Sequence, residues 1–181
     1  MLRNPHTTTR RALTAILIAG MALFAPGCYF SSGDSERDSS VQGIAVKPVQ
    51  KNRDAAEAFR LVNEERAKRG MQTLNRRGDL DAAAYAHARD LIRMNQLSHV
   101  SSDGSQLENR LADLDWEWAG ENLARNKGFD SPAREAVTGW IASPKHYENM
   151  FRADYSQAGM AALYDPDTGF TYFVQIFIIP A

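Results

Sequence analysis

The chain lacks several features by which whole classes of protein are recognised. It has a single cysteine, Cys28, so no disulfide can form within the chain. Its apolar run at residues 12–25 is shorter than the roughly 20 residues of a membrane-spanning helix. It has no basic excess either, because 21 Lys and Arg stand against 22 Asp and Glu, a formal charge of −1. Nucleic-acid binding is therefore not expected, since it normally requires a basic surface.

The N-terminal segment resembles a bacterial export signal. Three arginines precede the apolar run at residues 12–25, which has the length of a signal hydrophobic region. A short Ala-Pro-Gly stretch then leads to Cys28, and small residues before a lone cysteine resemble the lipobox of lipoproteins. We expect residues 1–27 to be a lipoprotein signal peptide and Cys28 to be lipidated, the alternative for Cys28 being an ordinary buried thiol. Removal of three Arg and no acid leaves 18 Lys and Arg against 22 acids, a formal charge of −4.

Residues 28–52 read as a tether and residues 53–181 as one domain. The first segment is rich in Ser, Gly and charge and has no sustained apolar period, so it cannot bury enough apolar surface to offset its ordering entropy. As a coil it would hold the domain about 25–30 Å from its anchor. The remainder has the usual size of a single domain. We expect a monomer in the cell envelope, attached to the membrane through lipidated Cys28 and facing the extracytoplasmic side.

Apolar spacing and end signals predict helices through most of the domain. A first helix should run from Asp54 to a C-terminal glycine at Gly70, and a second from an Asp79 cap to about Asn95. Ser105 and Glu108 have the spacing of a capping box for a short third helix. The remaining signals are an N-terminal Ser131-Pro132 pair for a fourth helix, a break at Pro144 and further turns over residues 145–151.

The C-terminal end is β-like. Residues 158–164 are apolar, residues 169–179 are rich in β-branched and aromatic residues, and a Pro-, Asp- and Gly-containing turn separates the two segments. In the second segment both alternating sets of side chains are largely apolar, which predicts a strand covered on both faces. We therefore expect the two segments to form an antiparallel hairpin that lies between helical layers.

Short motifs spread along the domain resemble one known family. The matching residues are Leu61-Val62-Asn63, Arg66, Gly70, Leu97-Ser98-His99, Asp103-Gly104, Arg110, Gly120-Glu121-Asn122-Leu123-Ala124, Trp140-Ile141-Ala142-Ser143-Pro144-Lys145-His146, Asn149 and Gln175. In order and approximate spacing they resemble the CAP superfamily, named for cysteine-rich secretory proteins, antigen 5 and pathogenesis-related 1, in its short bacterial form. The resemblance implies an α+β fold, a three-layer α-β-α sandwich with a central antiparallel sheet and a cleft across one face.

The resemblance also implies a site. Many members of the family place two His and two Glu in the cleft, where the histidines can bind a divalent metal. Residue by residue, His99 matches the first histidine, Glu121 the first glutamate and His146 the second histidine, whereas Ser143 stands where the second glutamate would be. We therefore expect His99, His146 and Glu121 to form a metal site for Zn²⁺ or another divalent ion. If Glu121 does not reach the ion directly, the site has two protein ligands and binds weakly.

Each of these residues also has a structural alternative. His87, on the second predicted helix, is expected to be packed or at the surface, outside the matched site. Glu121 could instead be a buried carboxylate that fixes nearby backbone. A Ser143, His146 and Glu121 hydrolase can be drawn, but Ser143 lacks the flanking glycines of a nucleophile elbow, and Ser98 beside His99 has the same weakness. The three tryptophans are expected to line the core and cleft, with Trp116 and Trp118 on one face of any strand there.

Three functions remain open from the sequence. The leading one is a lipid-anchored binding or scaffold domain whose His/His/Glu cleft binds a metal. The second is a metal-dependent hydrolase of envelope peptide or ester substrates, in which His99 or His146 would be the general base and Glu121 its orienting group. The third is a carrier of lipid or another apolar ligand. Whether the protein is an enzyme is left open.

Overall fold

The computed structural model describes residues 2–5 and 48–181. Residues 6–47, Cys28 included, lie outside the described residues. The signal peptide, the lipidation of Cys28 and most of the tether over residues 28–52 therefore stay predictions.

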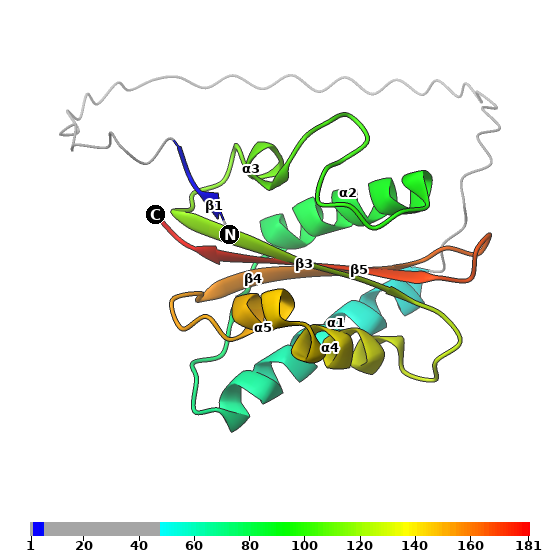
Figure 1. Cartoon of the computed structure of the whole chain (residues 1–181), viewed down its shortest axis with the longest axis horizontal. Helices are drawn as coiled ribbons and strands as arrows, with labels where there is room; N and C mark the ends of the chain where they lie inside the picture. Colours follow the sequence, from blue (N-terminus) through cyan, green and yellow to red (C-terminus); the bar gives the residue numbers. More distant parts are fainter. Residues whose placement is uncertain (1, 6–47) are drawn as a thin grey trace, which may run out of the picture. The chain divides into compact units, whose positions relative to one another are not determined.

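One five-stranded sheet forms the centre of the domain (Figure 1). Its three long strands are β3 (Trp118–Asn126), β4 (Gln157–Tyr164) and β5 (Thr171–Ile179), and β5 lies between the other two with antiparallel pairing on both sides. The short strands β1 (Leu2–Arg3) and β2 (Asn75–Arg76) complete the order β1-β3-β5-β4-β2. The predicted hairpin is confirmed. The sheet is mixed, however, because β2 pairs with β4 in parallel.

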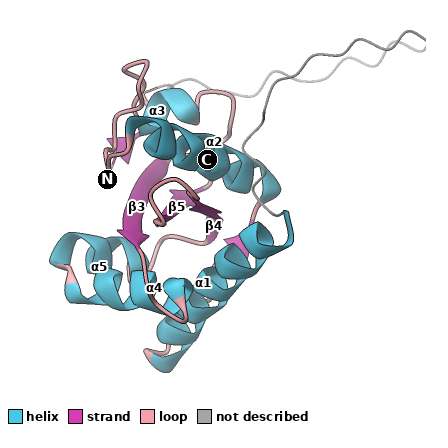
Figure 2. Cartoon of the chain, turned by 90° about the vertical axis from the view of Figure 1, so that its right-hand side faces the viewer, coloured by secondary structure: helices cyan, strands magenta, loops and turns pink. Residues whose placement is uncertain are grey.

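Helices cover both faces of the sheet (Figures 1 and 2), so the predicted α-β-α sandwich is confirmed. On one face lie α1 (Pro48–Lys68), α4 (Pro132–Ala142) and α5 (Pro144–Met150); on the other lie α2 (Gly78–Met94) and α3 (Leu107–Arg110).

Strand β5 contributes to a separate apolar core on each face. Phe173 and Phe177 pack toward α1 and α4, and Val174 and Ile176 pack toward α2. Burial on both faces explains why neither of its alternating residue sets is polar.

The helix ends follow local chemistry, with three corrections to the predictions. Helix α1 begins at Pro48, before the expected Asp54, consistent with proline at a first helical position. Helix α2 begins at Gly78, so Asp79 is not the predicted cap but lies in the first turn of the helix. There its side chain accepts a hydrogen bond from the Leu80 amide. The capping box of α3 is formed by Gln106 and Asn109, one residue after the predicted pair.

Two other predicted helix ends are confirmed. Gly70 has a φ of 70° and follows α1 in a Schellman arrangement, in which Met71 N–H donates to the Arg66 carbonyl. Ser131 accepts from the Arg134 amide at 3.3 Å, and Pro132 occupies the first turn of α4.

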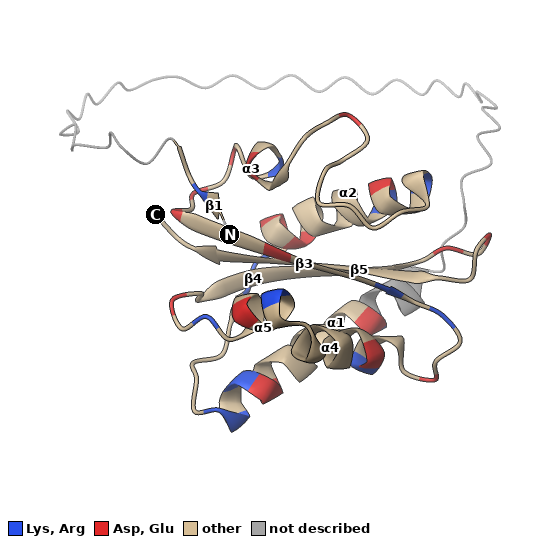
Figure 3. Cartoon of the chain, viewed as in Figure 1, with Lys and Arg blue, Asp and Glu red and all other residues tan. Residues whose placement is uncertain are grey.

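Charge is nearly absent from the long strands (Figure 3). Strands β4 and β5 contain no charged residue, and β3 contains only Glu121 and Arg125. A carboxylate in a sheet covered on both faces is costly unless it is paired, so Glu121 is the natural starting point for the site. No helix within residues 2–5 and 48–181 is long and apolar enough to cross a membrane.

Candidate functional site

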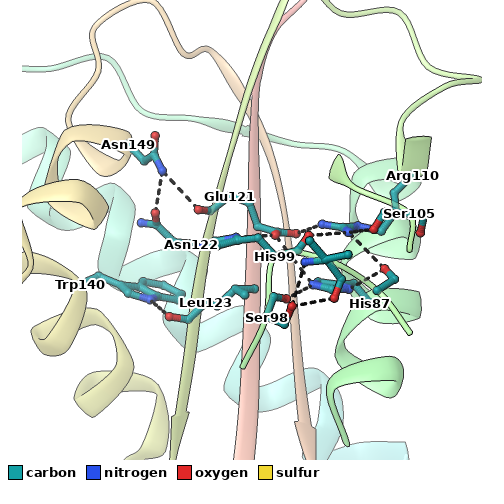
Figure 4. A network of polar contacts seen from close by, with 12 residues as sticks. His87, Ser98, His99, Ser105, Arg110, Glu121, Asn122, Leu123, Trp140 and Asn149 are labelled. Carbon is teal, nitrogen blue, oxygen red and sulfur yellow. Dashed lines mark hydrogen bonds and ion pairs between the residues drawn. The ribbon is translucent and has the colours of Figure 1, made fainter. Parts of the chain in front are cut away.

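Glu121 lies in the middle of β3, and its carboxylate is almost fully buried. Arg110 Nη2 donates to Oε2 at 2.6 Å, and His99 Nδ1 lies 2.9 Å from Oε1 (Figure 4). Only 2% of the Glu121 side chain and 8% of the Arg110 side chain are exposed. Such a pair is tolerated because the guanidinium compensates the buried charge and both carboxylate oxygens accept a hydrogen bond.

His99 lies in the loop after α2, and Glu121 holds its ring by one nitrogen. A carboxylate only accepts, so the 2.9 Å contact assigns the proton to Nδ1 of His99. In the neutral ring Nε2 then carries the lone pair. The His99 side chain is 61% exposed, so this end of the imidazole is accessible.

His146 comes from α5, on the opposite side of the sheet. Asn122 Nδ2 donates to the His146 carbonyl at 3.0 Å, and Asn149 Nδ2 donates to Asn122 Oδ1 at 2.9 Å. Burial lowers the pKa of His146, and the nearby charge of His99 lowers it further. Both effects favour the neutral form of His146.

One edge of β3 is largely free of a neighbouring strand, so residues from both faces of the sheet can reach it. Strand β1 pairs only with Trp118 and Ala119, so the rest of this edge needs other partners. Asn149 Nδ2 donates to the Glu121 carbonyl at 3.3 Å, and Trp140 Nε1 donates to the Leu123 carbonyl at 3.0 Å (Figure 4). Residues of α4 and α5 therefore close this edge from one side while His99 approaches from the other.

Two residues belong to the site although neither was expected there from the sequence. His87 is 1% exposed, and its Nε2 lies 3.8 Å from Glu121 Oε1, so its expected place outside the site is corrected. Arg110 was identified only as a motif residue. The spacing of Leu80, Ala84 and His87 was a usable signal, because it places His87 on the apolar face of α2.

The tryptophans belong to the core, as expected, but Trp116 and Trp118 lie on opposite faces of the sheet. Trp116 precedes β3 and donates its Nε1–H to the Leu111 carbonyl, buried toward α2 and α3. Trp118 begins β3 and packs against the opposite core, together with buried Trp140. The prediction that Trp116 and Trp118 share a strand face is wrong, because only Trp118 belongs to the strand.

The donors present suit a two-histidine metal centre better than a three-ligand one. Within the described residues, no group of three or more His, Cys, Asp or Glu is arranged to hold a metal ion. Both Glu121 oxygens already accept, one from Arg110 and one from His99. Metal-binding histidines characteristically donate their second nitrogen to a carboxylate, and the His99–Glu121 pair has this form. Direct ligation by Glu121 stays a prediction.

A serine nucleophile is not assembled here. Ser98 Oγ bonds to the Val100 backbone, and Ser143 joins α4 to α5, where its side chain makes no capping hydrogen bond. Within the described part of the chain, neither serine hydrogen-bonds to His99 or His146. Ser143 ends a helix, as the sequence indicates.

The chain folds as an α-β-α sandwich in which His99 contacts a buried glutamate of β3 and the His146 backbone is bonded to the next residue of that strand. The sequence model of the family described as "CAP: Cysteine-rich secretory protein family" matches residues 59–177. The chain therefore belongs to this family.

One curated relative matches part of the chain. The uncharacterized membrane protein YlbC of Bacillus subtilis is 35% identical over 102 residues, which are 55% of this chain and 29% of that protein. The chain thus spans less than a third of the length of this curated relative.

Two bacterial structures share the fold. An outer surface protein from Borrelia burgdorferi has a TM-score of 0.64 at 22% identity, covering 71% of this chain and 94% of that chain. An extracellular protein containing a SCP domain from Bacillus anthracis has a TM-score of 0.65 at 24% identity, covering 78% and 45%.

Proposed function

We propose that this domain is a metal-dependent binding domain in which His99 and His146 bind one divalent ion while Glu121 orients His99. The observation that carries the proposal is the 2.9 Å contact between His99 Nδ1 and Glu121 Oε1. It fixes the tautomer and leaves the Nε2 lone pair on a largely exposed ring. The lowered pKa of His146 adds a second neutral imidazole at neutral pH.

The donor set favours Zn²⁺ or a similar borderline ion, for which imidazole nitrogen is a common ligand. Two protein ligands leave coordination positions to water or to a ligand from solution. When bound, the ion would supply a Lewis acid. With Ser143 in place of a second carboxylate, we expect weaker binding than at a site with three or four protein ligands.

We also propose that the domain acts outside the cytoplasm, attached through Cys28. The names of the relatives support this location, since they describe a membrane protein, an outer surface protein and an extracellular protein. The export-like segment and the cysteine after it supply the sequence argument.

A second candidate is hydrolysis of an envelope peptide or ester. The oriented His99–Glu121 pair favours it, because this is the geometry of a general base and its orienting group. Without a serine in place, the nucleophile would be water. Turnover that is unchanged in His99→Ala and in His146→Ala would exclude this role.

Calorimetric titration of the full chain with Zn²⁺ tests the metal proposal. Wild-type protein should bind one ion, His99→Ala and His146→Ala should each weaken the binding strongly, and Leu80→Val, a change in the core of α2, should retain it. No heat with the wild type, or equal binding in the wild type and both histidine variants, would contradict the proposal.

A further inference from the structure

His87 is a buried histidine whose two ring nitrogens both point to the loop that carries His99. Its Nε2 lies 2.9 Å from the Ser98 carbonyl (Figure 4). Its Nδ1 lies 3.2 Å from Ser101 Oγ. A carbonyl can only accept, so Nε2 carries the proton and Nδ1 accepts from the serine hydroxyl. One ring therefore fixes the chain on both sides of His99.

The bonds around this loop have a consistent direction. Arg110 Nη1 donates to Ser101 Oγ at 3.2 Å, Ser101 donates to His87, and His87 donates to the Ser98 carbonyl. Arg110 Nη1 also donates to the His99 carbonyl at 3.1 Å, while its Nη2 bonds to Glu121. Groups that both accept and donate in such a chain strengthen one another.

The neutral state of His87 fits this chain of bonds. Its ring is buried, and burial lowers its pKa. The neutral ring has one donor and one acceptor, which matches the carbonyl on one side and the hydroxyl on the other.

A purely apolar role for His87 explains less. Its helix neighbours Ala84, Ala88 and Leu91 already form the apolar face of α2, and an apolar side chain at position 87 would extend that face. It would leave the Ser98 carbonyl without this donor and the Ser101 hydroxyl without this acceptor. The backbone of residues 98–101 would then lose two of the bonds that determine where His99 lies.

We infer that His87 is a positioning residue of this site: it holds the backbone of residues 98–101 so that the His99 ring meets Glu121 in the tautomer that leaves Nε2 free. This inference rests on the proposed function, because it gives His87 a part in presenting a metal ligand. His87 itself does not touch the ion.

The test compares the full-length wild type with His87→Phe and His87→Gln, all labelled with ¹⁵N-histidine and kept metal-free with a chelator. Long-range ¹H–¹⁵N spectra at pH 7.5 report which nitrogen of His99 is protonated. The wild type should show a His99 proton held on Nδ1. In His87→Phe, which keeps an aromatic ring of somewhat larger volume without polar atoms, the His99 signals should move toward those of a freely exchanging imidazole. Glutamine offers one donor and one acceptor, so His87→Gln should restore the wild-type pattern.

Leu80→Val is the matched control, because Leu80 is buried on the same helix and lies outside the bonds around residues 98–101. It should lower stability without changing the His99 tautomer. If His87→Phe does not fold, Ser101→Ala removes the bond to His87 Nδ1 and takes its place in the comparison. Wild-type His99 signals in a folded His87→Phe, or in Ser101→Ala if that variant is used, would overturn the inference.

Zinc titration of the same variants separates this inference from the function on which it rests. His87→Phe should weaken Zn²⁺ binding by roughly 10-fold or more, the size of loss seen when partners that orient a metal ligand are removed. If the wild type binds no Zn²⁺, the proposed function fails, while the tautomer comparison still decides the role of His87.

Discussion

The two sides of β3 hold their histidines by different means. On the α2 side, the His99 ring itself is bound, through a buried carboxylate that Arg110 also holds. On the α5 side, the backbone of His146 is bound by the neutral amide of Asn122, and within the described residues no hydrogen bond reaches its ring. One side fixes a tautomer by charge, and the other fixes the position of a helix. A metal centre built this way would combine an oriented ligand with an adaptable one.

Loss of a supporting side chain should lower the free energy of unfolding more on the α5 side than on the α2 side. Arg66 is fully buried, and within the described residues its guanidinium donates to backbone carbonyls alone. Among them are the carbonyl of Met150 at the end of α5 and those of Arg152 and Tyr155 beyond it. Arg66→Met leaves these acceptors unpaired, so the free energy of unfolding should fall by about 4 kcal/mol or more. Urea denaturation measures it. A loss below about 1 kcal/mol, the net value of a single hydrogen bond, would show that α5 does not depend on this clamp.

The charged side should respond to Glu121→Gln with a smaller loss of stability and a larger loss of binding. Arg110 keeps one oxygen to donate to, and the free energy of unfolding should fall by about 2 kcal/mol. The new amide can donate to His99 Nδ1, which would shift the ring proton to Nε2 and remove the free lone pair. Zn²⁺ binding should weaken roughly 10- to 100-fold. Unchanged zinc affinity in the folded variant would refute the orienting role of Glu121.

Gly120 tests the packing of the α5 side. A Cβ at this position would lie 2.6 Å from the Tyr155 hydroxyl and 2.8 Å from Asn149 Oδ1, well inside contact distance. Gly120→Ala should therefore lower the free energy of unfolding by about 1–3 kcal/mol, because the buried tyrosine has little room to move. Gly139→Ala is the control, since a Cβ added there would meet no neighbouring atom within 4 Å. Equal thermal midpoints for the two variants would contradict this packing.

Acid should weaken both sides through their histidines. Burial is the main cause of the lowered pKa of His87 and of His146, so the unfolded chain binds protons more readily at these positions. Their contribution to stability is complete above the ordinary pKa of about 6.5 and is lost as pH falls through the lower folded values. The urea midpoint should drop between pH 7.5 and 5.5, and by less in His87→Gln. A midpoint that rises over this range would contradict the assignment of neutral rings.

Ser143→Glu should have the smallest effect on stability and should raise metal affinity. Ser143 is half-buried between α4 and α5 and makes no capping hydrogen bond with its side chain, so the free energy of unfolding should change by no more than about 0.5 kcal/mol. The added carboxylate stands where the family resemblance places a second glutamate. Calorimetry should then show tighter Zn²⁺ binding than in the wild type. Weaker binding would contradict the expectation that residue 143 lies near the bound ion.

The sequence predicted the layers of the fold better than the details of the site. Periodicity and end signals such as Gly70 and Ser131-Pro132 are local, so helices and the C-terminal hairpin could be located from them. Strand β3 was missed as a strand, because Gly120, Glu121 and Asn122 have low β-propensity and owe their conformation to pairing with β5. The strand conformation of β3 therefore depends on tertiary contacts more than on its local sequence.

The site shows the same division between local and long-range information. The motifs around His99, Glu121 and His146 were visible in the sequence, but the engagement of both Glu121 oxygens was not. That engagement depends on Arg110 from a different element. His87 was expected to be packed or at the surface, because it lies on a long helix outside the matched motif positions. Only the fold shows that the Ser98 carbonyl lies against its ring.

X-ray absorption at the zinc edge of the Zn²⁺-loaded full chain tests the two-histidine centre most directly. Such a centre should give scattering from two imidazoles with Zn–N distances of about 2.0–2.1 Å, completed by oxygen ligands, and one imidazole fewer in either His99→Ala or His146→Ala at saturating zinc. A spectrum with no imidazole scattering, or one that both histidine variants leave unchanged, would contradict it.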